Sequence, residues 1–397
     1  GNTIQYSYDL LGRLTTTVDA MGVTVSQTVY DANGNATSVT DALGNTTTYQ
    51  YDKANRLISY TDPETEKSAA SYTYDLLGNL KTVTDGENNT TSYTYDSSGN
   101  LTSVTDGEGN VTGYTYDLMG SRTSMTDANG NVTQYEVGAL GWLERLTDPE
   151  EREESYLYDC CGNMVRKVDK NGVSSTYKYD SLGNLLEKRI PTTGDFAYYS
   201  YGAWGELQFS YNNTMDWDIL LLYDLAGRVT KVWYSPDEVI AENSYDEVGN
   251  LTKQTVLGED TYYEYDAANR MTAVKNADGA TIAEYEYDSN GNRKKLTLGQ
   301  ITTEYTYDKA NRVTSVVNKK ASQQLSSFLY SYDDAGRVKS KTDSDVTESY
   351  EYDGAGRIKK VTEPGRITQY SYDSCGNRTQ MTQSYATPQD GGSRAYG

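Results

Sequence analysis

The chain has 397 residues, a formal net charge of −22 and a pI near 4.4. Nucleic acid and anionic membranes would repel so acidic a chain, so neither is expected as a partner. The sequence contains no histidine, which excludes Ser-His-Asp and Cys-His catalytic systems and every zinc site that uses histidine.

Composition alone suggests a disordered chain, because the mean hydropathy is −0.74. An internal repeat contradicts that interpretation. The dipeptide Tyr-Asp occurs sixteen times, with its tyrosines at positions 8, 30, 51, 74, 95, 116, 158, 179, 223, 245, 265, 287, 307, 332, 352 and 372. Degenerate units at 135–141 and 201–205 fill the two wider gaps. We therefore predict one elongated domain, an unbroken array of about 18 units over residues 1–385.

The two ends of the array carry further expectations. Residues 1–9 match the second half of a unit, since they correspond to residues 109–117. A start in mid-repeat predicts a segment of a longer polypeptide, so that a secretion signal would lie outside it. Residues 386–397 follow the last repeat and are predicted to be a disordered C-terminal tail.

A complete unit, residues 93–117, contains the pattern Asp-x-x-Gly twice. Asp96 and Gly99 bound the first copy, and Asp106 and Gly109 bound the second. Asp in the first position of a type I turn accepts backbone N–H bonds, and Gly tolerates the left-handed conformation that often follows. These four residues are therefore predicted to have a structural role in turns.

The segments between the turns, residues 100–105 and 110–116, are rich in Thr, Val and Tyr and contain no Pro, which predicts strands. Each unit is then a β-hairpin, and the fold is all-β. Tyr114 and Tyr116 share a face, and phenols buried there need hydrogen-bond partners. About 36 strands spaced ~4.8 Å apart would make a ribbon roughly 170 Å long. Sheets of that width curl, so we expect a coiled antiparallel ribbon that forms an open arc, a spiral or a partial hollow shell.

The signature Tyr-x-Tyr-Asp-x-x-Gly-[Asn/Arg]-[Leu/Val], clear at 72–80 and followed closely at 350–358, resembles the RHS/YD-repeat family across residues 1–385. The resemblance implies a coiled β-ribbon that forms a hollow shell. In bacterial members such a shell encloses a C-terminal toxin, and in teneurins it is part of an adhesion receptor. The Asp-Pro-rich self-cleavage core of toxin-bearing members has no match here, nor has a toxin or plug domain. The implied partners are thus the remaining parts of a longer polypeptide.

The residues that could act in catalysis, metal binding or a disulfide can each be explained by a structural role in a turn. Paired carboxylates for glycoside hydrolysis stay formally open, but most aspartates occupy the first position of a turn. The segment 127–131 places oxygen ligands as calcium loops do, yet it lacks the final Glu, so a turn is favoured. Cys160 and Cys161 could form a strained vicinal disulfide, although two partly exposed thiols are favoured. We therefore expect no enzymatic activity, no cofactor and no metal site.

Charge is distributed unevenly along the chain. Basic residues cluster at 293–295, 319–320 and 359–360, whereas residues 85–148 are strongly acidic. The favoured interpretation is a solvated face. The alternative is a docking patch for another segment of the shell.

Two function classes remain. The first is a non-catalytic wall segment of a secreted or cell-surface bacterial shell that encloses or presents a toxin or effector. The second is a cell-surface carbohydrate-binding or adhesion array, in which exposed rings stack on sugars. The aromatic residues that could form such a platform are Tyr198, Tyr201, Trp204, Phe209, Tyr211, Trp217 and Trp233. A locally thicker core is the favoured alternative for them, because aromatic residues at strand period are usually buried.

Overall fold

The computed structural model describes residues 3–214, 217–234 and 238–385, and in those residues it contains 36 β-strands and no helix. This confirms the prediction of an all-β array of antiparallel hairpins. The predicted tail, residues 386–397, lies outside the described residues. No helix within the described ranges is long and apolar enough to cross a membrane.

The first twelve strands are β1 (Gln5–Tyr8), β2 (Leu14–Val18), β3 (Thr24–Tyr30), β4 (Ala36–Asp41), β5 (Thr46–Tyr51), β6 (Leu57–Thr61), β7 (Ser68–Tyr74), β8 (Leu80–Asp85), β9 (Thr90–Tyr95), β10 (Leu101–Thr105), β11 (Val111–Tyr116) and β12 (Arg122–Thr126). The next twelve are β13 (Val132–Val137), β14 (Leu143–Thr147), β15 (Glu153–Tyr158), β16 (Met164–Val168), β17 (Ser174–Tyr179), β18 (Leu185–Ile190), β19 (Asp195–Tyr201), β20 (Leu207–Asn212), β21 (Trp217–Tyr223), β22 (Val229–Tyr234), β23 (Glu238–Tyr245) and β24 (Leu251–Val256). The last twelve are β25 (Glu259–Tyr265), β26 (Met271–Lys275), β27 (Thr281–Tyr287), β28 (Arg293–Leu298), β29 (Ile301–Tyr307), β30 (Val313–Lys320), β31 (Gln323–Tyr332), β32 (Val338–Asp343), β33 (Val346–Tyr352), β34 (Ile358–Glu363), β35 (Arg366–Tyr372) and β36 (Arg378–Tyr385).

Within each hairpin of the described residues the two strands pair antiparallel, as β9 does with β10 and β19 with β20. In both of these hairpins the register shifts by one residue beside the tyrosine of Tyr-Asp. Tyr95 pairs with Leu101 and Thr94 pairs with Ser103, so Thr102 is an extra residue. Such a bulge increases the local twist of a hairpin.

The Asp-x-x-Gly turns are held by the aspartate side chain. In the turn after β9, Asp96 Oδ1 accepts the N–H of Ser98 and the N–H of Asn100, both at 2.9 Å. Asp96 Oδ2 accepts the Asn100 side-chain N–H at 2.9 Å, and that bond is the largest cause of the lowered pKa of Asp96. Gly99 donates its N–H to Asp96 O at 3.1 Å and has φ +86°. A left-handed residue is thus required in this position, and Asn55 occupies the equivalent position elsewhere with φ +62°.

The second turn of the same unit is built in the same way. Asp106 Oδ1 accepts the N–H of Glu108 and the N–H of Asn110 at 2.9 Å, and Gly109 has φ +85°. Because the strands alternate direction, the Tyr-Asp turns line one edge of the ribbon and these second turns line the other. The two edges therefore carry different residues.

The tyrosine of Tyr-Asp links each hairpin to the one before it. Its hydroxyl donates to a backbone carbonyl 14 to 19 residues earlier, over distances of 2.6 to 3.0 Å, in eleven described repeats. In the repeat of Tyr352 the acceptor is Val338 O at 2.7 Å. An arginine of the preceding turn covers the same ring, with Arg337 Cζ 4.6 Å from the centroid of Tyr352. The buried phenols expected from the sequence thus have partners, and burial raises the pKa of Tyr352.

The core is a half-buried layer of rings on one face of a single sheet. Within the described residues, the only buried hydrophobic side chains are Ala70, Ala197, Ala273 and Ala283. The opposite face is mostly polar, with hydroxyl pairs such as Thr115 Oγ1 and Ser124 Oγ at 2.6 Å. No repeat can enclose a core alone, so each depends on its neighbours for stability.

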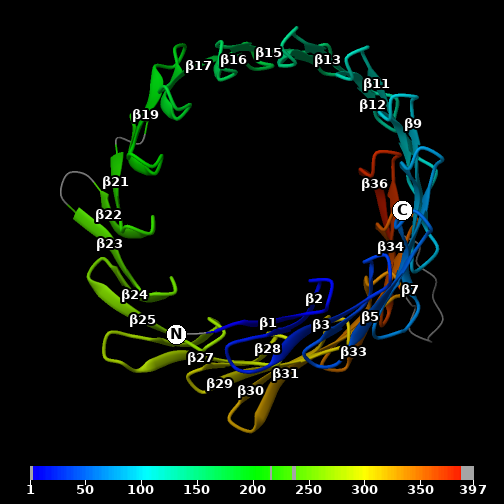
Figure 1. Cartoon of the computed structure of the whole chain (residues 1–397), viewed down its shortest axis with the longest axis vertical. Coiled ribbons are helices and arrows are strands. Elements are labelled where there is room, and N and C mark those ends of the chain that lie inside the picture. The colour runs from blue at the N-terminus through cyan, green and yellow to red at the C-terminus, as the bar shows by residue number, and fades with distance from the viewer. Residues whose placement is uncertain (1–2, 215–216, 235–237, 386–397) are drawn as a thin grey trace. The chain divides into compact units, whose positions relative to one another are not determined.

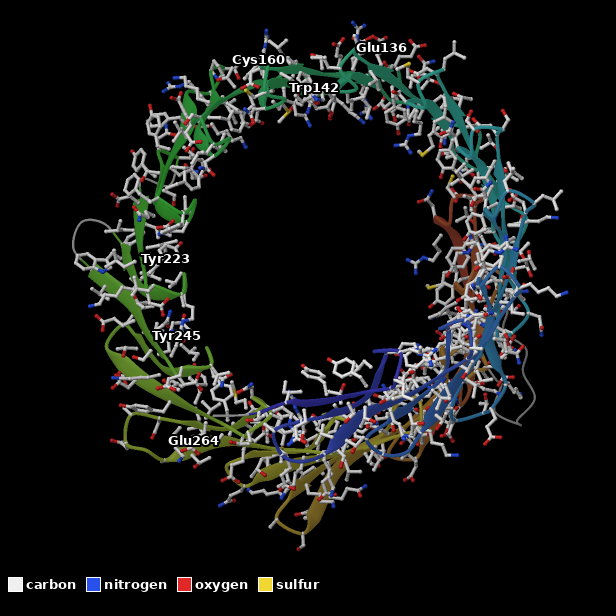
Figure 2. All side chains as sticks on the ribbon, viewed as in Figure 1. Glu136, Trp142, Cys160, Tyr223, Tyr245 and Glu264 are labelled. Carbon is white, nitrogen blue, oxygen red and sulfur yellow. The ribbon has the colours of Figure 1, made fainter. Side chains whose placement is uncertain are left out.

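The chain divides into two compact units. Unit 1 comprises residues 1–112, 265–273 and 282–397, and unit 2 comprises residues 113–264 and 274–281. Unit 2, taken by itself, is a curved ribbon of successive hairpins (Figure 1). The labelled Tyr223 and Tyr245 lie on its concave side (Figure 2).

Candidate contact surfaces

Four of the predicted platform residues lie on the same face of unit 2. Tyr198 on β19 stands opposite Tyr211 on β20, and Phe209 on β20 stands opposite Leu220 on β21. Leu220 in turn faces Trp233 on β22. Alternation along the strands places all of them on the face that carries Thr and Ser in other repeats. We call Phe196, Tyr198, Phe209, Tyr211, Leu220 and Trp233 the aromatic patch.

Ring contacts and one arginine hold the edge of the aromatic patch. The Phe196 ring centroid lies 5.0 Å from that of Tyr198 and 5.9 Å from that of Tyr211. Arg189 Cζ lies 5.0 Å from the Phe196 centroid, and Arg189 Nη2 donates to Tyr198 Oη at 3.0 Å. Arg189 Nε also donates to Glu187 Oε1 at 2.9 Å. The patch is therefore an ordered half-buried surface with a fixed cation at its border.

Two polar atoms at the aromatic patch have no hydrogen-bond partner in the described part of the chain. They are Trp233 Nε1, a donor, and Asp218 Oδ1, an acceptor, and both are buried. Asp218 stands opposite Tyr211 and therefore shares its face. Buried polar atoms without partners are rare in folded proteins, so this pair distinguishes the patch from the polar face elsewhere.

The other three predicted platform residues do not join the aromatic patch. Tyr201 belongs to the tyrosine face, where burial raises its pKa. Trp204 lies in the Tyr-Asp type turn 202–205 and is 94% exposed. The side chain of Trp217 lies outside the described residues. The structure thus separates the predicted platform into a patch, a core tyrosine and an edge tryptophan.

Trp204 belongs to a row of exposed apolar side chains along one edge of unit 2. Seven successive turns form this edge: 117–120, 138–141, 159–162, 180–183, 202–205, 224–227 and 246–249. Six of them expose a large apolar side chain, and the seventh carries Cys160 and Cys161. We call this row the apolar rim, with Leu118, Met119, Leu140, Leu182, Trp204, Leu225 and Val248 as its members.

Unit 1 joins turns that are far apart in the sequence. Second turns between residues 41 and 109 contact Tyr-Asp turns between residues 288 and 356, and we call these contacts the turn seam. Glu64 Oε2 accepts the N–H of Lys309 at 3.0 Å, and Glu87 Oε1 accepts the N–H of Asp334 at 2.7 Å. One repeat further, Glu108 Oε1 accepts the N–H of Gly354 at 2.5 Å. These three pairs are 245 to 247 residues apart.

Charged side chains reinforce the turn seam. Arg312 Nη1 lies 3.0 Å from Asp62 Oδ2, and both side chains are mostly buried. Lys67 Nζ lies 2.5 Å from Asp334 Oδ2 and donates to it, which raises the pKa of Lys67. Asn290 Nδ2 donates to Asp41 Oδ2 at 2.6 Å. Specific contacts therefore join the two rows of turns in four successive repeats.

Two glycines allow the closest approach in the turn seam. A Cβ atom on Gly107 would lie 2.0 Å from Gly354 O, and a Cβ on Gly86 would lie 1.9 Å from Asp334 O. Real side chains do not approach so closely, so the backbones touch only because both residues are glycine.

The basic clusters predicted as a possible docking patch lie within their own hairpins. Lys295 Nζ pairs with Glu286 Oε1 at 2.9 Å, and Lys360 Nζ pairs with Glu351 Oε1 at 2.8 Å. The turn seam instead uses Arg312, Lys67 and backbone N–H groups. Its acidic side does come in part from the acidic segment 85–148, through Glu87 and Glu108.

The irregular unit at 135–142 is packed rather than open. The Trp142 ring centroid lies 5.4 Å from that of Tyr158, and a Cβ on Gly162 would lie 3.0 Å from Trp142 Cζ2. Glu136 and Trp142 project to opposite sides of the ribbon (Figure 2). A shallow cavity of about 580 Å³ beside them is lined by Leu140, Arg145 and other side chains.

Groups that could bind a metal or act as nucleophiles are dispersed. In the described ranges, no three His, Cys, Asp or Glu residues are grouped to hold a metal ion. The three cysteines are free and exposed, and Cys160 Sγ lies 3.9 Å from Cys161 Sγ. The turn aspartates accept hydrogen bonds within their own turns, as Asp96 does. Within the described ranges, these groups are therefore spread over separate turns.

Sequence reasoning missed the glutamates of the turn seam. Glu64, Glu87 and Glu108 share the third position of the second turn, in the sequences Asp-Pro-Glu, Asp-Gly-Glu and Asp-Gly-Glu. That recurrence is a usable signal, but nothing in it names a partner almost 250 residues away. Arg189 and Leu220 were missed as well, because neither is aromatic and only the strand pairing places them beside Phe196 and Phe209.

Known repeat families and solved structures resemble this chain. The RHS Repeat profile matches residues 30–67 and 245–281. A crystal structure described as TcdB2-TccC3-Cdc42 aligns with a TM-score of 0.63 at 16% identity, covering 98% of this chain and 25% of that one. TcdB2-TccC3 without its hypervariable C-terminal region gives a TM-score of 0.64 at 15% identity, covering 99% and 25%. At such identity these structures establish the fold alone.

The chain spans about a quarter of the length of the structures that it matches. A search of curated protein sequences found no match. The Teneurin YD-shell profile, however, matches residues 61–239 and 315–385, which is more than half of the chain. With its tyrosine-linked hairpins and its joined rows of turns, the chain belongs to the Teneurin YD-shell family of structural repeat proteins.

Proposed function

We propose that this chain is a non-catalytic wall segment of a β-shell in a secreted or cell-surface bacterial protein. The shell encloses or presents another part of the same longer polypeptide, such as a toxin, effector or plug domain. The turn seam is the observation that carries this proposal. A ribbon one sheet thick can act as a wall only if its edges are closed, and the seam closes one edge against the other within unit 1.

The chemistry of the seam suits a permanent wall. Glu87 and Glu108 bind backbone N–H groups, which every residue except proline provides. Hydrogen bonds to a charged group contribute about 1.5–3 kcal/mol each. The approach at Gly86 and Gly107 excludes side chains from the contact and leaves little space between the two rows.

The similar solved structures support the proposal that this chain is one part of a longer polypeptide. They belong to TcdB2-TccC3 assemblies, and this chain covers only a quarter of each matched chain. A shell segment of this size would be one part of a longer polypeptide. We further propose that the shell encloses another domain of that polypeptide and that the whole protein is secreted by a bacterium or displayed on its surface.

The test uses the longer polypeptide that contains this segment. We expect the enclosed domain to resist protease when the seam is intact, and to become sensitive when Gly107→Val forces the two rows apart. Ser97→Val is the matched control, since Ser97 is exposed in a Tyr-Asp turn outside the seam. Equal digestion of the enclosed domain in the parent and in Gly107→Val would overturn the wall function.

A second candidate is carbohydrate binding at the aromatic patch, favoured by the unpartnered Trp233 Nε1 and Asp218 Oδ1. A sugar hydroxyl can both accept and donate a hydrogen bond, and its ring can stack on an aromatic face. Binding on a glycan array that is lost in Trp233→Ala and retained in Trp204→Ala would support this candidate. Saturable turnover of chromogenic glycosides, abolished by one Asp or Glu substitution, would contradict the non-catalytic assignment.

A further inference from the structure

The glutamate contacts of the turn seam do not select which turns meet. Three glutamates each accept the backbone N–H of the second residue of a Tyr-Asp turn: Glu64 from Lys309, Glu87 from Asp334 and Glu108 from Gly354. Every residue except proline offers such an N–H, and the Tyr-Asp turns between residues 288 and 376 contain no proline. The same three contacts would therefore be available if each second turn met the Tyr-Asp turn one repeat earlier or one repeat later.

The contact between Asn290 and Asp41 does depend on the alignment of the two rows. Asn290 Nδ2 donates to Asp41 Oδ2 at 2.6 Å, and Asn290 Oδ1 accepts the N–H of Leu43 at 3.1 Å. The next Tyr-Asp turn along the chain carries Ala310 in the place of Asn290. A slip of the second turns toward later Tyr-Asp turns would therefore remove both hydrogen bonds.

The ion pair between Arg312 and Asp62 discriminates in the opposite direction. Arg312 Nη1 lies 3.0 Å from Asp62 Oδ2, and the two side chains are only 17% and 11% exposed. The residue in the place of Arg312 one repeat earlier is Asn292. A slip toward earlier turns would leave the buried Asp62 carboxylate opposite an amide. Removing the cation of a buried ion pair is strongly unfavourable, so this alignment is disfavoured.

The pair of Lys67 and Asp334 discriminates in both directions. Lys67 Nζ lies 2.5 Å from Asp334 Oδ2. In the place of Asp334 stand Lys309 one repeat earlier and Gly354 one repeat later. The first slip would bring two lysines together, and the second would remove the carboxylate. Lys67 is 63% exposed, so the pair adds little stability by itself, but it penalises both alternatives.

We propose that these three pairs, Asn290–Asp41, Arg312–Asp62 and Lys67–Asp334, are the register keys of the turn seam. The inference rests on the proposed wall function and adds what decides which turns meet. The glutamates hold the two rows together, whereas the register keys select one alignment among those that the repeat allows. A slip in either direction breaks two of the three keys. Buried polar contacts can specify register in this way even where they add little stability.

The register fixes how much ribbon lies between two joined turns. In the three glutamate contacts the joined residues are 245 to 247 positions apart. A slip by one repeat would lengthen or shorten that interval by the 20 to 25 residues of one repeat. The register keys thus set the length of wall that the seam closes off.

The experiment measures the distance between two spin labels by electron paramagnetic resonance. In the whole chain with Cys160→Ser, Cys161→Ser and Cys375→Ser, the exposed positions of Thr46→Cys and Lys359→Cys carry the labels. They lie three repeats apart along the seam, or about 29 Å at ~4.8 Å per strand. The parent should give a single distance of that order. Removing the keys by Lys67→Gln, Asn290→Ala and Arg312→Gln should add a second population displaced by about 10 Å, the advance of one repeat.

The matched control weakens the glutamate contacts and keeps the keys, through Glu64→Gln, Glu87→Gln and Glu108→Gln. It should retain the single parent distance. A parent without a defined distance would refute the seam, and the wall function with it. A defined parent distance that stays single when the keys are removed would refute the register keys alone. So would distances that merely spread without a second population, or slipped populations of equal size in the glutamate control.

A rekeyed variant tests the selection of register directly. It exchanges residues between neighbouring Tyr-Asp turns through Asn292→Arg, Arg312→Asn, Lys309→Asp and Asp334→Lys, which leaves the composition of the chain unchanged. Asp62 then meets a cation, and Lys67 meets a carboxylate, only in the alignment one repeat earlier. The main distance between the labels is expected to lengthen by about 10 Å. A main distance equal to that of the parent contradicts the proposed keys.

Discussion

Gly107→Ala is the substitution that isolates the turn seam. Gly107 does not have a positive φ, and the same turn position is Ala42 or Ala128 in other repeats, so alanine is compatible with the turn itself. The added Cβ would nevertheless lie 2.0 Å from Gly354 O. The two rows must separate locally, and the bond from the Gly354 N–H to Glu108 Oε1 lengthens or breaks.

The loss of stability in Gly107→Ala can be estimated from that one hydrogen bond. A hydrogen bond to a charged acceptor contributes about 1.5–3 kcal/mol. Replacing Gly by Ala in a compatible conformation stabilises the folded state by about 0.4–1 kcal/mol, because alanine lowers the conformational entropy of the unfolded chain. We therefore expect a net loss of roughly 1–2 kcal/mol, confined to the seam.

Hydrogen exchange measured by mass spectrometry checks this prediction. Peptides that contain residues 106–110 and 353–357 should exchange about 5 to 30 times faster in Gly107→Ala, since 1.4 kcal/mol corresponds to a factor of ten. Peptides of unit 2 should be unchanged. Unchanged exchange at residues 353–357 would refute the contact between the two turns.

Three further predictions concern the repeat itself. Gly99→Val should lower the melting temperature far more than Ser98→Val, because Gly99 has φ +86° and a left-handed L-residue costs about 1–2 kcal/mol or more; equal melting temperatures would refute this role for Gly99. Tyr352→Phe removes the donor to Val338 O and should cost about 1 kcal/mol, whereas Tyr6→Phe changes an exposed ring and should cost little; chemical denaturation distinguishes them, and equal losses would count against the tyrosine links. The pKa of Asp96 is lowered in the folded chain, so its contribution to stability is complete above its unfolded pKa of about 3.9 and is lost as the pH falls through the lower folded pKa. Circular dichroism should therefore show a folded chain at pH 5 and acid unfolding beginning below about pH 4, and unfolding already complete at pH 5 would contradict this assignment.

The fold could be predicted because its determinants are local. The recurrence of Tyr-Asp and of Asp-x-x-Gly within 20 to 25 residues specifies hairpins, and the strands expected at 100–105 and 110–116 correspond to β10 (Leu101–Thr105) and β11 (Val111–Tyr116). Alternation along each strand then separates ring-bearing residues from Thr and Ser. These rules act over fewer residues than one repeat, so a single sequence reveals them.

The contact surfaces depend on longer distances. Glu87 and the Asp334 N–H are 247 residues apart, and no periodicity of one repeat indicates which turns will meet. The structure divides the predicted platform residues between different surfaces for a different reason. Tyr198 and Tyr201 are close in sequence but point to opposite faces, and Trp204 follows them into a turn, so proximity along the chain did not predict a shared surface.

The turn seam can be tested most directly by zero-length cross-linking with a carbodiimide, followed by peptide mass spectrometry. Lys67 Nζ and Asp334 Oδ2 are 2.5 Å apart, although the residues are separated by 267 positions. The wall account predicts an intramolecular amide between Lys67 and Asp334 that disappears in Asp334→Asn, whereas the hairpin pair Lys360 and Glu351 is cross-linked in both chains. Cross-linking of Lys360 to Glu351 without any Lys67–Asp334 product would contradict the seam, and with it the proposal that this ribbon closes into a wall.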